Sequence, residues 1–287
     1  MIAGWLKAGI FEAGKGFAPT GEGTPQGGVI SPLLLNVALH GLEEAAGARY
    51  RKTGPQAGIT MPGAPVLVRY ADDFAVMCTS REQAEQVKER LSAWLAPRGL
   101  SFNEDKTSVV HLDQGFDFLG FNVRRYGDKL LIKPSKAALR RIRERLSTAM
   151  RVLRGANAEA VVQKLNPIIR GWAAYYRNAV SSKAFASLDD HMWRLTYKWA
   201  RHSHPKKSRH WVTARYFGVF NKSRPRCRWV FGDRDSGFYV HKFAWTPIIR
   251  HQMVKGASSP DDPALTDYWA QRRRRSQPPL GTATLRL

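Results

Sequence analysis

Two adjacent carboxylates, Asp72 and Asp73, stand between two runs of residues that favour β-strands, VLVRY (66–70) and FAVMC (74–78). Aspartate is rare within strands, so the pattern predicts a β-hairpin with the acidic pair at its tip. The two carboxylates would repel each other, and a bound divalent cation would remove that cost. Hard oxygen ligands suit Mg²⁺, which often bridges a carboxylate and substrate phosphates. The pair alone fits either a metal site for phosphoryl transfer or an ordinary Asp-Asp turn.

The residues around this hairpin predict an α+β domain that ends near residue 125. Apolar spacing and amphipathic periodicity predict helices at residues 1–17, 29–46 and 81–99. Pro32 falls in the first turn of the second helix, where its missing N–H does no harm, and Gly99 ends the third. Glycine and proline predict loops at residues 14–28 and 51–65, and further strands are expected at residues 100–112 and 116–126.

The pattern changes after Pro134 to long basic helices. Three are expected, at residues 135–155 with Ser135 as the N-cap, at 158–180 with an interruption at Pro167, and at 185–204. Residues 204–232 are basic and aromatic together, residues 256–263 are expected to form a linker, and Arg272 to Arg275 form an arginine run. Residues 276–287 are expected to be a disordered tail.

Charge divides the chain unequally. The protein has 287 residues and a formal net charge of +23. Residues 1–120 hold 11 Lys and Arg against 13 Asp and Glu, whereas residues 121–287 hold 35 against 10. The excess predicts a polyanionic partner, with nucleic acid preferred over a membrane surface. We therefore expect chemistry in the first half and electrostatic binding in the second.

Several other classes of protein are not expected. No apolar run reaches the roughly 18 residues of a transmembrane helix, and the first residues do not resemble a secretory signal. The two cysteines, Cys78 and Cys227, are far apart, so neither a disulfide scaffold nor a zinc site is predicted. These features favour a cytoplasmic, bacterial protein, with an organelle as the alternative location.

Four segments in order resemble the motifs of reverse transcriptases. They are GTPQGGVISPLLLNVALHGL (23–42), YADDF (70–74), LSFNEDKT (100–107) and FDFLGF (116–121). Further along, LNPIIRGWAAYYR (165–177) resembles the signature of the maturase domain of group II intron-encoded proteins, and residues 202–217 and 245–269 continue that likeness. The chain thus resembles group II intron reverse transcriptase/maturases. The resemblance implies part of a right-hand polymerase palm followed by an α-helical thumb/maturase domain.

The resemblance also implies roles for individual residues. Asp72 would be the main ligand of Mg²⁺ and Asp73 the supporting carboxylate, while Lys106 would act on the leaving pyrophosphate or be an ordinary surface lysine. The residues expected near template, nucleotide and primer end are Gln26, Gly27, Tyr70 and Ala71. The residues expected to position the primer strand are Phe118, Leu119 and Gly120, of which Phe118 fits core packing equally well.

One departure from the family concerns the metal site. The family's polymerase site has a third carboxylate, on a strand that precedes the TPQGG segment, and the acids before Thr24 are Glu12 and Glu22, neither in a matching strand. This predicts an N-terminally truncated member: a gene fragment, an internal start, or half of a split enzyme whose second chain supplies the fingers and the missing palm strand. No paired cysteines of an HNH endonuclease occur, so DNA cleavage is not expected.

The basic half is expected to bind RNA. The candidate contact residues are Arg140, Arg141, Arg143, Arg145, Arg151, Lys206, Lys207 and Arg209. The interleaved aromatic residues could stack on unpaired bases, but helical spacing favours a bundle core for Trp172, Tyr175, Tyr176, Trp193, Tyr197 and Trp199.

Taken together, the sequence predicts a palm segment at residues 1–125, a thumb/maturase domain at 126–220 and a basic nucleic-acid-binding segment at 221–275. The expected function is RNA-directed DNA synthesis together with splicing and mobility of an intron. The expected partners are intron RNA, an RNA template and a DNA primer. The alternatives are a non-catalytic RNA-binding splicing factor and an inactive gene fragment.

Overall fold

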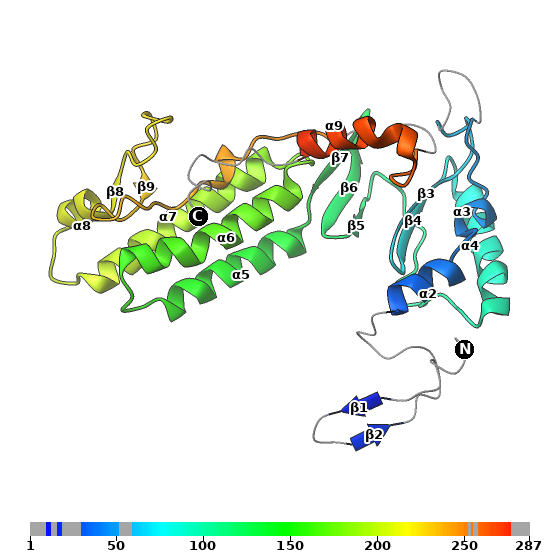
Figure 1. Cartoon of the computed structure of the whole chain (residues 1–287), viewed down its shortest axis with the longest axis horizontal. Helices are drawn as coiled ribbons and strands as arrows, with labels where there is room; N and C mark the ends of the chain where they lie inside the picture. The colour runs from blue at the N-terminus through cyan, green and yellow to red at the C-terminus, as the bar shows by residue number, and fades with distance from the viewer. Residues whose placement is uncertain are drawn as a thin grey trace. The chain divides into compact units, whose positions relative to one another are not determined.

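The computed structural model describes residues 10–12, 16–18, 30–51, 59–251, 254 and 258–276 (Figure 1). The chain forms two compact units, one of residues 1–109 with 255–257 and the other of residues 110–254 with 258–287. Helices and strands occur together in both, which agrees with the expected mixture of α and β structure. The predictions for Gln26, Gly27 and the tail from residue 277 fall outside the described residues.

The first unit contains two antiparallel strand pairs and several helices. Its strands are β1 (Ile10–Glu12), β2 (Gly16–Ala18), β3 (Val66–Tyr70) and β4 (Asp73–Met77), and its helices are α2 (Ser31–Ala38), α3 (Leu42–Ala45), α4 (Arg81–Leu95) and η1 (Ala96–Arg98). β1 pairs with β2 and β3 pairs with β4, both antiparallel. The hairpin predicted from the acidic pair and the amphipathic helix after it are confirmed.

Three predictions for the first unit are wrong. Residues 10–12 and 16–18 are strands rather than parts of a helix and a loop. The helix expected at residues 29–46 is broken into α2 and α3, because Gly41 between them adopts a φ of 87°, which ends a helix. Residues 100–112 form turns instead of a strand, with the N–H groups of Lys106 and Thr107 both bonded to the carbonyl of Asn103.

A small apolar core lies between α2, α3, α4 and one face of the hairpin. Its buried members are Leu39, Leu42, Ala46, Val87, Leu91 and Leu95. Leu67 of β3 and Phe74 and Val76 of β4 pack against them. Because side chains alternate along a strand, Tyr70 and Asp73, which are cross-strand partners, lie on the opposite face of the hairpin.

The second unit joins a small sheet to a helical bundle. The antiparallel sheet has β5 (Phe116–Phe118), β6 (Phe121–Tyr126) and β7 (Lys129–Pro134). The later elements are α5 (Lys136–Val152), α6 (Ala158–Tyr176), α7 (Ser182–Ser203), α8 (Arg209–Tyr216), β8 (Phe217–Gly218), β9 (Val230–Phe231), η2 (Phe243–Trp245), η3 (Pro263–Leu265) and α9 (Thr266–Ser276).

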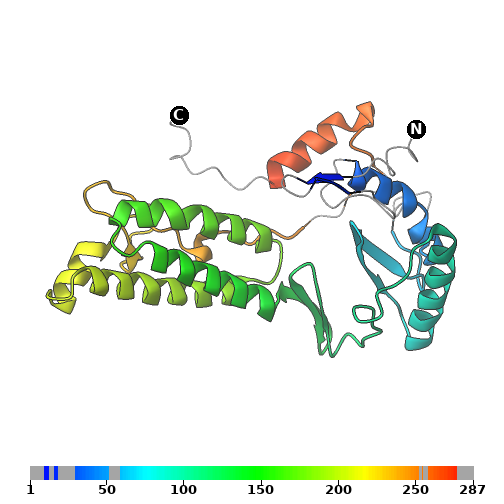
Figure 2. The same cartoon turned by 90° about the horizontal axis from the view of Figure 1, so that it is seen from below.

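Helices α5, α6 and α7 lie side by side in both views (Figures 1 and 2). Their fully buried residues include Leu146, Val161, Ile169 and Leu188, which follow the apolar period of each helix. Ser135 caps α5 as predicted, accepting a hydrogen bond of 3.1 Å from the N–H of Ala138. The described residues contain no helix long and apolar enough to cross a membrane.

The interruption expected at Pro167 is wrong, since α6 runs through it. Proline removes the N–H that would bond to the carbonyl of Gln163, four residues earlier. Both Gln163 and Pro167 are exposed, so water can hydrate the freed carbonyl. The neighbouring Asn166 fixes the helix from its side chain, donating to the carbonyl of Tyr239 and accepting from the N–H of His241.

Candidate active site and nucleic-acid interface

The acidic pair lies at the tip of the β3–β4 hairpin. Tyr70 pairs with Asp73, so Ala71 and Asp72 form the two-residue turn and Asp73 begins β4. All four side chains are exposed, and Tyr70 keeps 68% of its surface accessible. Ala71 has a φ of 55°, a conformation that costs an L-residue free energy and is uncommon outside turns. The backbone therefore holds the Asp72 side chain at the outermost point of the hairpin.

Arg69 supports this turn from the hairpin's inner side. Its guanidinium donates to the carbonyl of Ala71 at 2.9 Å and to the side-chain oxygen of Asn36, on α2, at 3.1 Å. The two bonds connect the turn to α2, which lies in the segment 23–42 that resembles a reverse transcriptase motif. Neither residue is singled out by the sequence, because no local pattern indicates a contact across 33 positions.

The acidic pair offers an incomplete set of ligands for a divalent cation. The carboxylate oxygens of Asp72 and Asp73 are the hard donors that Mg²⁺ prefers. Within the described ranges, however, no cluster of three or more His, Cys, Asp or Glu residues is arranged to hold a metal ion. Asp72 and Asp73 thus fit a cation as two ligands of a larger set, and the described residues do not supply the rest.

Lys106 is exposed in the turn that follows Asn103. No described hydrogen bond or ion pair joins its side chain to Asp72 or Asp73, so the fold of this unit leaves its predicted role untested. An exposed lysine on a turn is free to reach a phosphate, but it is equally typical of a solvated surface.

The second motif-bearing hairpin joins β5 to β6, and its turn is Leu119-Gly120. Phe118 pairs with Phe121, and the turn residues have φ values of 50° and 79°. Positive φ at both central positions is typical of a tight hairpin turn, and glycine adopts it most easily. The structure therefore places the three predicted primer-strand residues, 118–120, at one hairpin tip.

Two tyrosines of α6 hold this tip. Tyr175 Oη donates to the carbonyl of Leu119 at 2.8 Å, and Tyr176 Oη donates to the carbonyl of Gly120 at 3.2 Å. Phe121 stacks on the Tyr175 ring with centroids 5.2 Å apart. A β-carbon at Gly120 would lie 2.7 Å from Tyr176 Oη, closer than packing allows. Helix α6 and the turn at residues 118–120 are thus held together by hydrogen bonds and ring packing.

The prediction of a bundle core for six aromatic residues is partly wrong. Tyr176 and Trp199 are buried, and Trp172 and Tyr197 pack against the core while partly exposed. Tyr175 and Trp193 are exposed. Partial burial raises the pKa of the Tyr176 hydroxyl, so it remains a protonated donor at neutral pH.

The predicted RNA-binding residues form two exposed basic groups. Arg140, Arg141, Arg145 and Arg151 are exposed on α5, and Lys206, Lys207 and Arg209 are exposed where α7 leads into α8. Arg143 differs, because it is half-buried and donates to the hydroxyl of Ser187, on α7, at 2.8 Å. Arg143 therefore links α5 to α7, a structural contact that does not depend on RNA.

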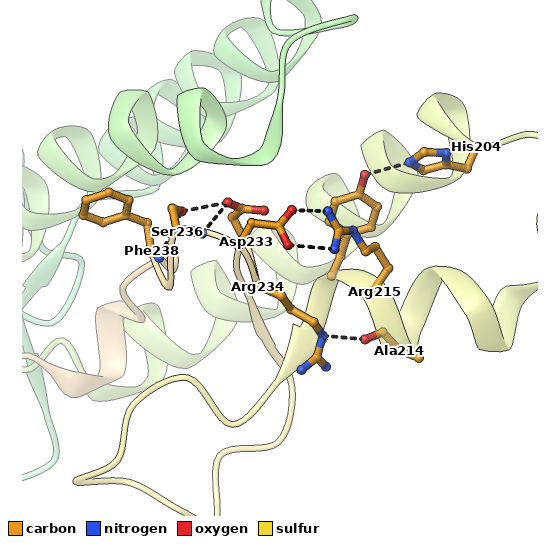
Figure 3. A network of polar contacts seen from close by, with 9 residues as sticks. His204, Ala214, Arg215, Asp233, Arg234, Ser236 and Phe238 are labelled. Atoms are coloured by element: carbon orange, nitrogen blue, oxygen red, sulfur yellow. Dashed lines mark hydrogen bonds and ion pairs between the residues drawn. The ribbon is translucent and has the colours of Figure 1, made fainter.

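A polar network fixes the chain after β9 to α8 (Figure 3). Arg215 forms a two-pronged ion pair with Asp235, at 2.6 and 3.3 Å. Arg234 donates to the carbonyl of Ala214 at 2.7 Å. The Ser236 hydroxyl donates to the Asp233 carboxylate at 2.7 Å, and this hydrogen bond lowers the pKa of Asp233. Residues 233–238 are therefore an ordered part of the helical unit.

Two protein family models match successive parts of this chain. The reverse transcriptase (RNA-dependent DNA polymerase) family model matches residues 1–123, and the model for the group II intron, maturase-specific domain matches residues 139–217. The two ranges hold the acidic hairpin and the basic helices respectively.

Curated relatives agree with this assignment. Protein YkfC of Escherichia coli (strain K12) is 32% identical over 152 residues, which cover 44% of this chain and 40% of that protein. Group II intron-encoded protein LtrA of Lactococcus lactis subsp. cremoris is 29% identical over 175 residues, covering 43% of this chain and 29% of that protein. The matches thus span less than half the length of these relatives. The chain thus has a reverse transcriptase region followed by a group II intron maturase-specific region, and this order supports a group II intron reverse transcriptase/maturase.

Proposed function

We propose that this chain acts in RNA-directed DNA synthesis and in binding of intron RNA during splicing and mobility. The observation that carries the proposal is the β3–β4 tip, where a turn supported by Arg69 presents two carboxylates to solvent. In this proposal the first unit is part of a polymerase palm, and the helices of the second unit form the thumb and maturase domain.

The proposed site uses the chain's residues in distinct ways. Asp72 and Asp73 hold Mg²⁺, which when bound neutralises the charge of the phosphates. Tyr70 and Ala71 lie beside the incoming nucleotide and the primer end, and Gln26 and Gly27 contact the template and the nucleotide. Lys106 stabilises the leaving pyrophosphate. The residues that position the primer strand are Phe118, Leu119 and Gly120, and Tyr175 and Tyr176 keep their turn in one conformation.

A second function, RNA binding without catalysis, is favoured by two observations. The described residues bring only Asp72 and Asp73 to the hairpin tip, without a third acidic ligand. Residues 121–287 also hold 35 Lys and Arg against 10 Asp and Glu, and the candidate contact residues are exposed. A protein that only binds intron RNA needs the basic surface and does not need the metal.

Primer extension on an RNA template with Mg²⁺ distinguishes the two functions. Extension that Asp72→Ala abolishes and that Asp128→Ala leaves intact supports the polymerase. Asp128 is a matched control because it is an exposed aspartate in another hairpin turn. Extension that survives Asp72→Ala would contradict the proposed metal site. Absence of extension, with RNA binding retained, would favour the binding function.

RNA binding is tested by its dependence on salt. Each phosphate contact contributes about 0.7 to 0.9 to the slope of log affinity against log salt concentration. Replacing Arg140 and Arg141 by glutamine should weaken binding and reduce the slope by roughly 2. Arg81→Gln is the control, since Arg81 is an exposed residue of α4 that already pairs with Glu85. Salt-independent binding would refute the electrostatic interface.

A further inference from the structure

A cavity opens between α7 and the β8–β9 segment. Its volume is about 350 Å³, and its lining includes Trp193, Thr196, Phe217, Trp229, Phe231 and Lys242. Small-molecule pockets begin at about 300 Å³, so the cavity can take one planar group of the size of a nucleobase. Buried residues such as Phe231 form its inner wall.

Two tryptophans stand at this cavity with much of their surface accessible. Trp193 is 37% exposed and Trp229 is 55% exposed. Their rings meet edge to face, 6.3 Å apart at 84°, and Trp193 also stacks on Tyr197 at 5.4 Å and 11°. Each ring is therefore fixed by aromatic neighbours while part of it remains open to solvent, which is the arrangement of a stacking platform.

The chain beside Trp229 is strongly basic. Lys222, Arg224, Arg226 and Arg228 lie on the segment between β8 and β9, which has no acidic residue between Val219 and Gly232. All four are exposed, and this segment projects from the helices in Figure 1. Alternating basic residues next to an exposed tryptophan are suited to the phosphates that flank a stacked base.

The acidic residues at the cavity are already engaged. Asp189 accepts hydrogen bonds from the N–H groups of Phe243 and Ala244, at 2.7 and 3.1 Å. Asp190 pairs with Arg194 at 2.8 Å. Lys242 lies on the cavity lining, and the exposed basic residues between β8 and β9 add positive charge beside it. This complementarity favours an anionic polymer over an apolar peptide or a second copy of the same basic chain.

We propose that this cavity binds one unpaired base of single-stranded RNA, stacked against Trp229 and Trp193, with Arg226 and Arg228 holding the adjacent phosphates. The proposal deepens the RNA binding of the proposed function and rests on it. Bases within a duplex are stacked on their neighbours and do not offer a free face. The cavity would therefore recognise a loop, bulge or end of a structured RNA.

The test compares two fluorescent RNA probes of equal length and charge, a ten-nucleotide adenosine oligomer and its abasic counterpart, binding to the full chain. Stacking is worth about 1 to 3 kcal/mol per base. Trp229→Ala should therefore weaken binding of the adenosine oligomer about 5- to 150-fold, leave the abasic probe unchanged and preserve the salt slope. Trp229→Phe should retain most of the affinity, whereas Arg228→Gln should weaken both probes and lower the slope by about 1.

Trp211→Ala is the control, since Trp211 is another exposed tryptophan of the same unit, at 37%, but does not line the cavity. Wild-type protein that binds both probes equally would overturn the cavity proposal alone, and so would equal loss in the Trp229 and Trp211 variants. A change of oligomeric state in Trp229→Ala, with RNA binding intact, would assign the surface to protein contact and also overturn it. Failure to bind either probe would refute the proposed RNA binding as well.

Discussion

Replacing Gly120 by alanine tests whether the two tyrosines of α6 hold the β5–β6 turn as the structure shows. The substitution has two separate costs. Gly120 has a φ of 79°, and the left-handed region costs an L-residue about 1 to 2 kcal/mol. The new β-carbon would also lie 2.7 Å from Tyr176 Oη, and such overpacking typically costs about 1 to 3 kcal/mol.

We therefore expect Gly120→Ala to lower the free energy of unfolding by about 2 to 5 kcal/mol. Gly127 provides the matched control. It has a φ of 57° in the β6–β7 turn, and a β-carbon there would meet no atom within 4 Å. Gly127→Ala should cost only the conformational part, about 1 to 2 kcal/mol.

Tyr176→Phe separates the clash from the backbone strain. It removes the hydroxyl, and the next ring atom, Cζ, lies at an ordinary 3.9 Å from the new β-carbon. Alone, Tyr176→Phe should cost about 1 kcal/mol for its hydrogen bond to Gly120. In the Tyr176→Phe background, Gly120→Ala should lower the free energy of unfolding by no more than Gly127→Ala does. The double variant Gly120→Ala/Tyr176→Phe should therefore be less destabilised than the sum of its two single variants.

Urea unfolding followed by tryptophan fluorescence is the appropriate assay. Seven of the nine tryptophans lie within residues 110–287, so the signal reports mainly on the unit that contains the turn. Equal destabilisation by Gly120→Ala and Gly127→Ala would refute the clash. Full additivity with Tyr176→Phe would show that the hydroxyl is not the group that Gly120 must accommodate.

Two charged groups, the partly buried Asp189 and the buried Arg177, give further predictions about stability. Burial raises the pKa of Asp189 from its ordinary value of 3.8 to about 6, so its protonated form stabilises the fold below pH 4 and this contribution is lost as the pH rises through 6. Thermal melts should show Asp189→Asn gaining stability relative to wild type between pH 4 and 7, by at most about 3 kcal/mol, and a constant difference would contradict this. Arg177 is 3% exposed, and its two terminal nitrogens have no hydrogen-bond partner among the described residues, so Arg177→Met should raise stability by about 1 to 4 kcal/mol in urea unfolding. A less stable Met variant would show that the guanidinium has a partner in solution.

The sequence predicts elements well where the signal is local. It predicts β3 and β4 because β-rich runs flank Asp72 and Asp73, and α5 because Ser135 precedes an amphipathic run. It does not predict the break at Gly41, because an isolated glycine is often tolerated inside a helix. The sequence also predicts a break at Pro167 that does not occur. Whether this proline lies on the exposed side of α6 depends on how the helix packs, which the sequence does not show.

The exposure of aromatic residues depends on packing that no spacing specifies. Tyr175 and Tyr176 are neighbours, and successive helical positions are about 100° apart. Helical spacing favours the core for both, whereas only Tyr176 is buried. The same spacing favours the core for Trp193. The fold leaves this ring partly exposed and brings Trp229, 36 positions later in the sequence, beside it.

The motif residues Ala71 and Leu119 share a property that their sequence gives no reason to expect. Among the described non-glycine residues, these two have a positive φ. Such a conformation costs about 1 to 3 kcal/mol and persists only where the surroundings enforce it. At each turn the enforcing group is a donor from another position, Arg69 to the carbonyl of Ala71 and Tyr175 to the carbonyl of Leu119. Because the turn residues themselves do not favour this conformation, the position of each tip depends on these donors. Residues outside each turn motif, Arg69 in one case and Tyr175 of a different motif in the other, therefore set the geometry of the turn residues.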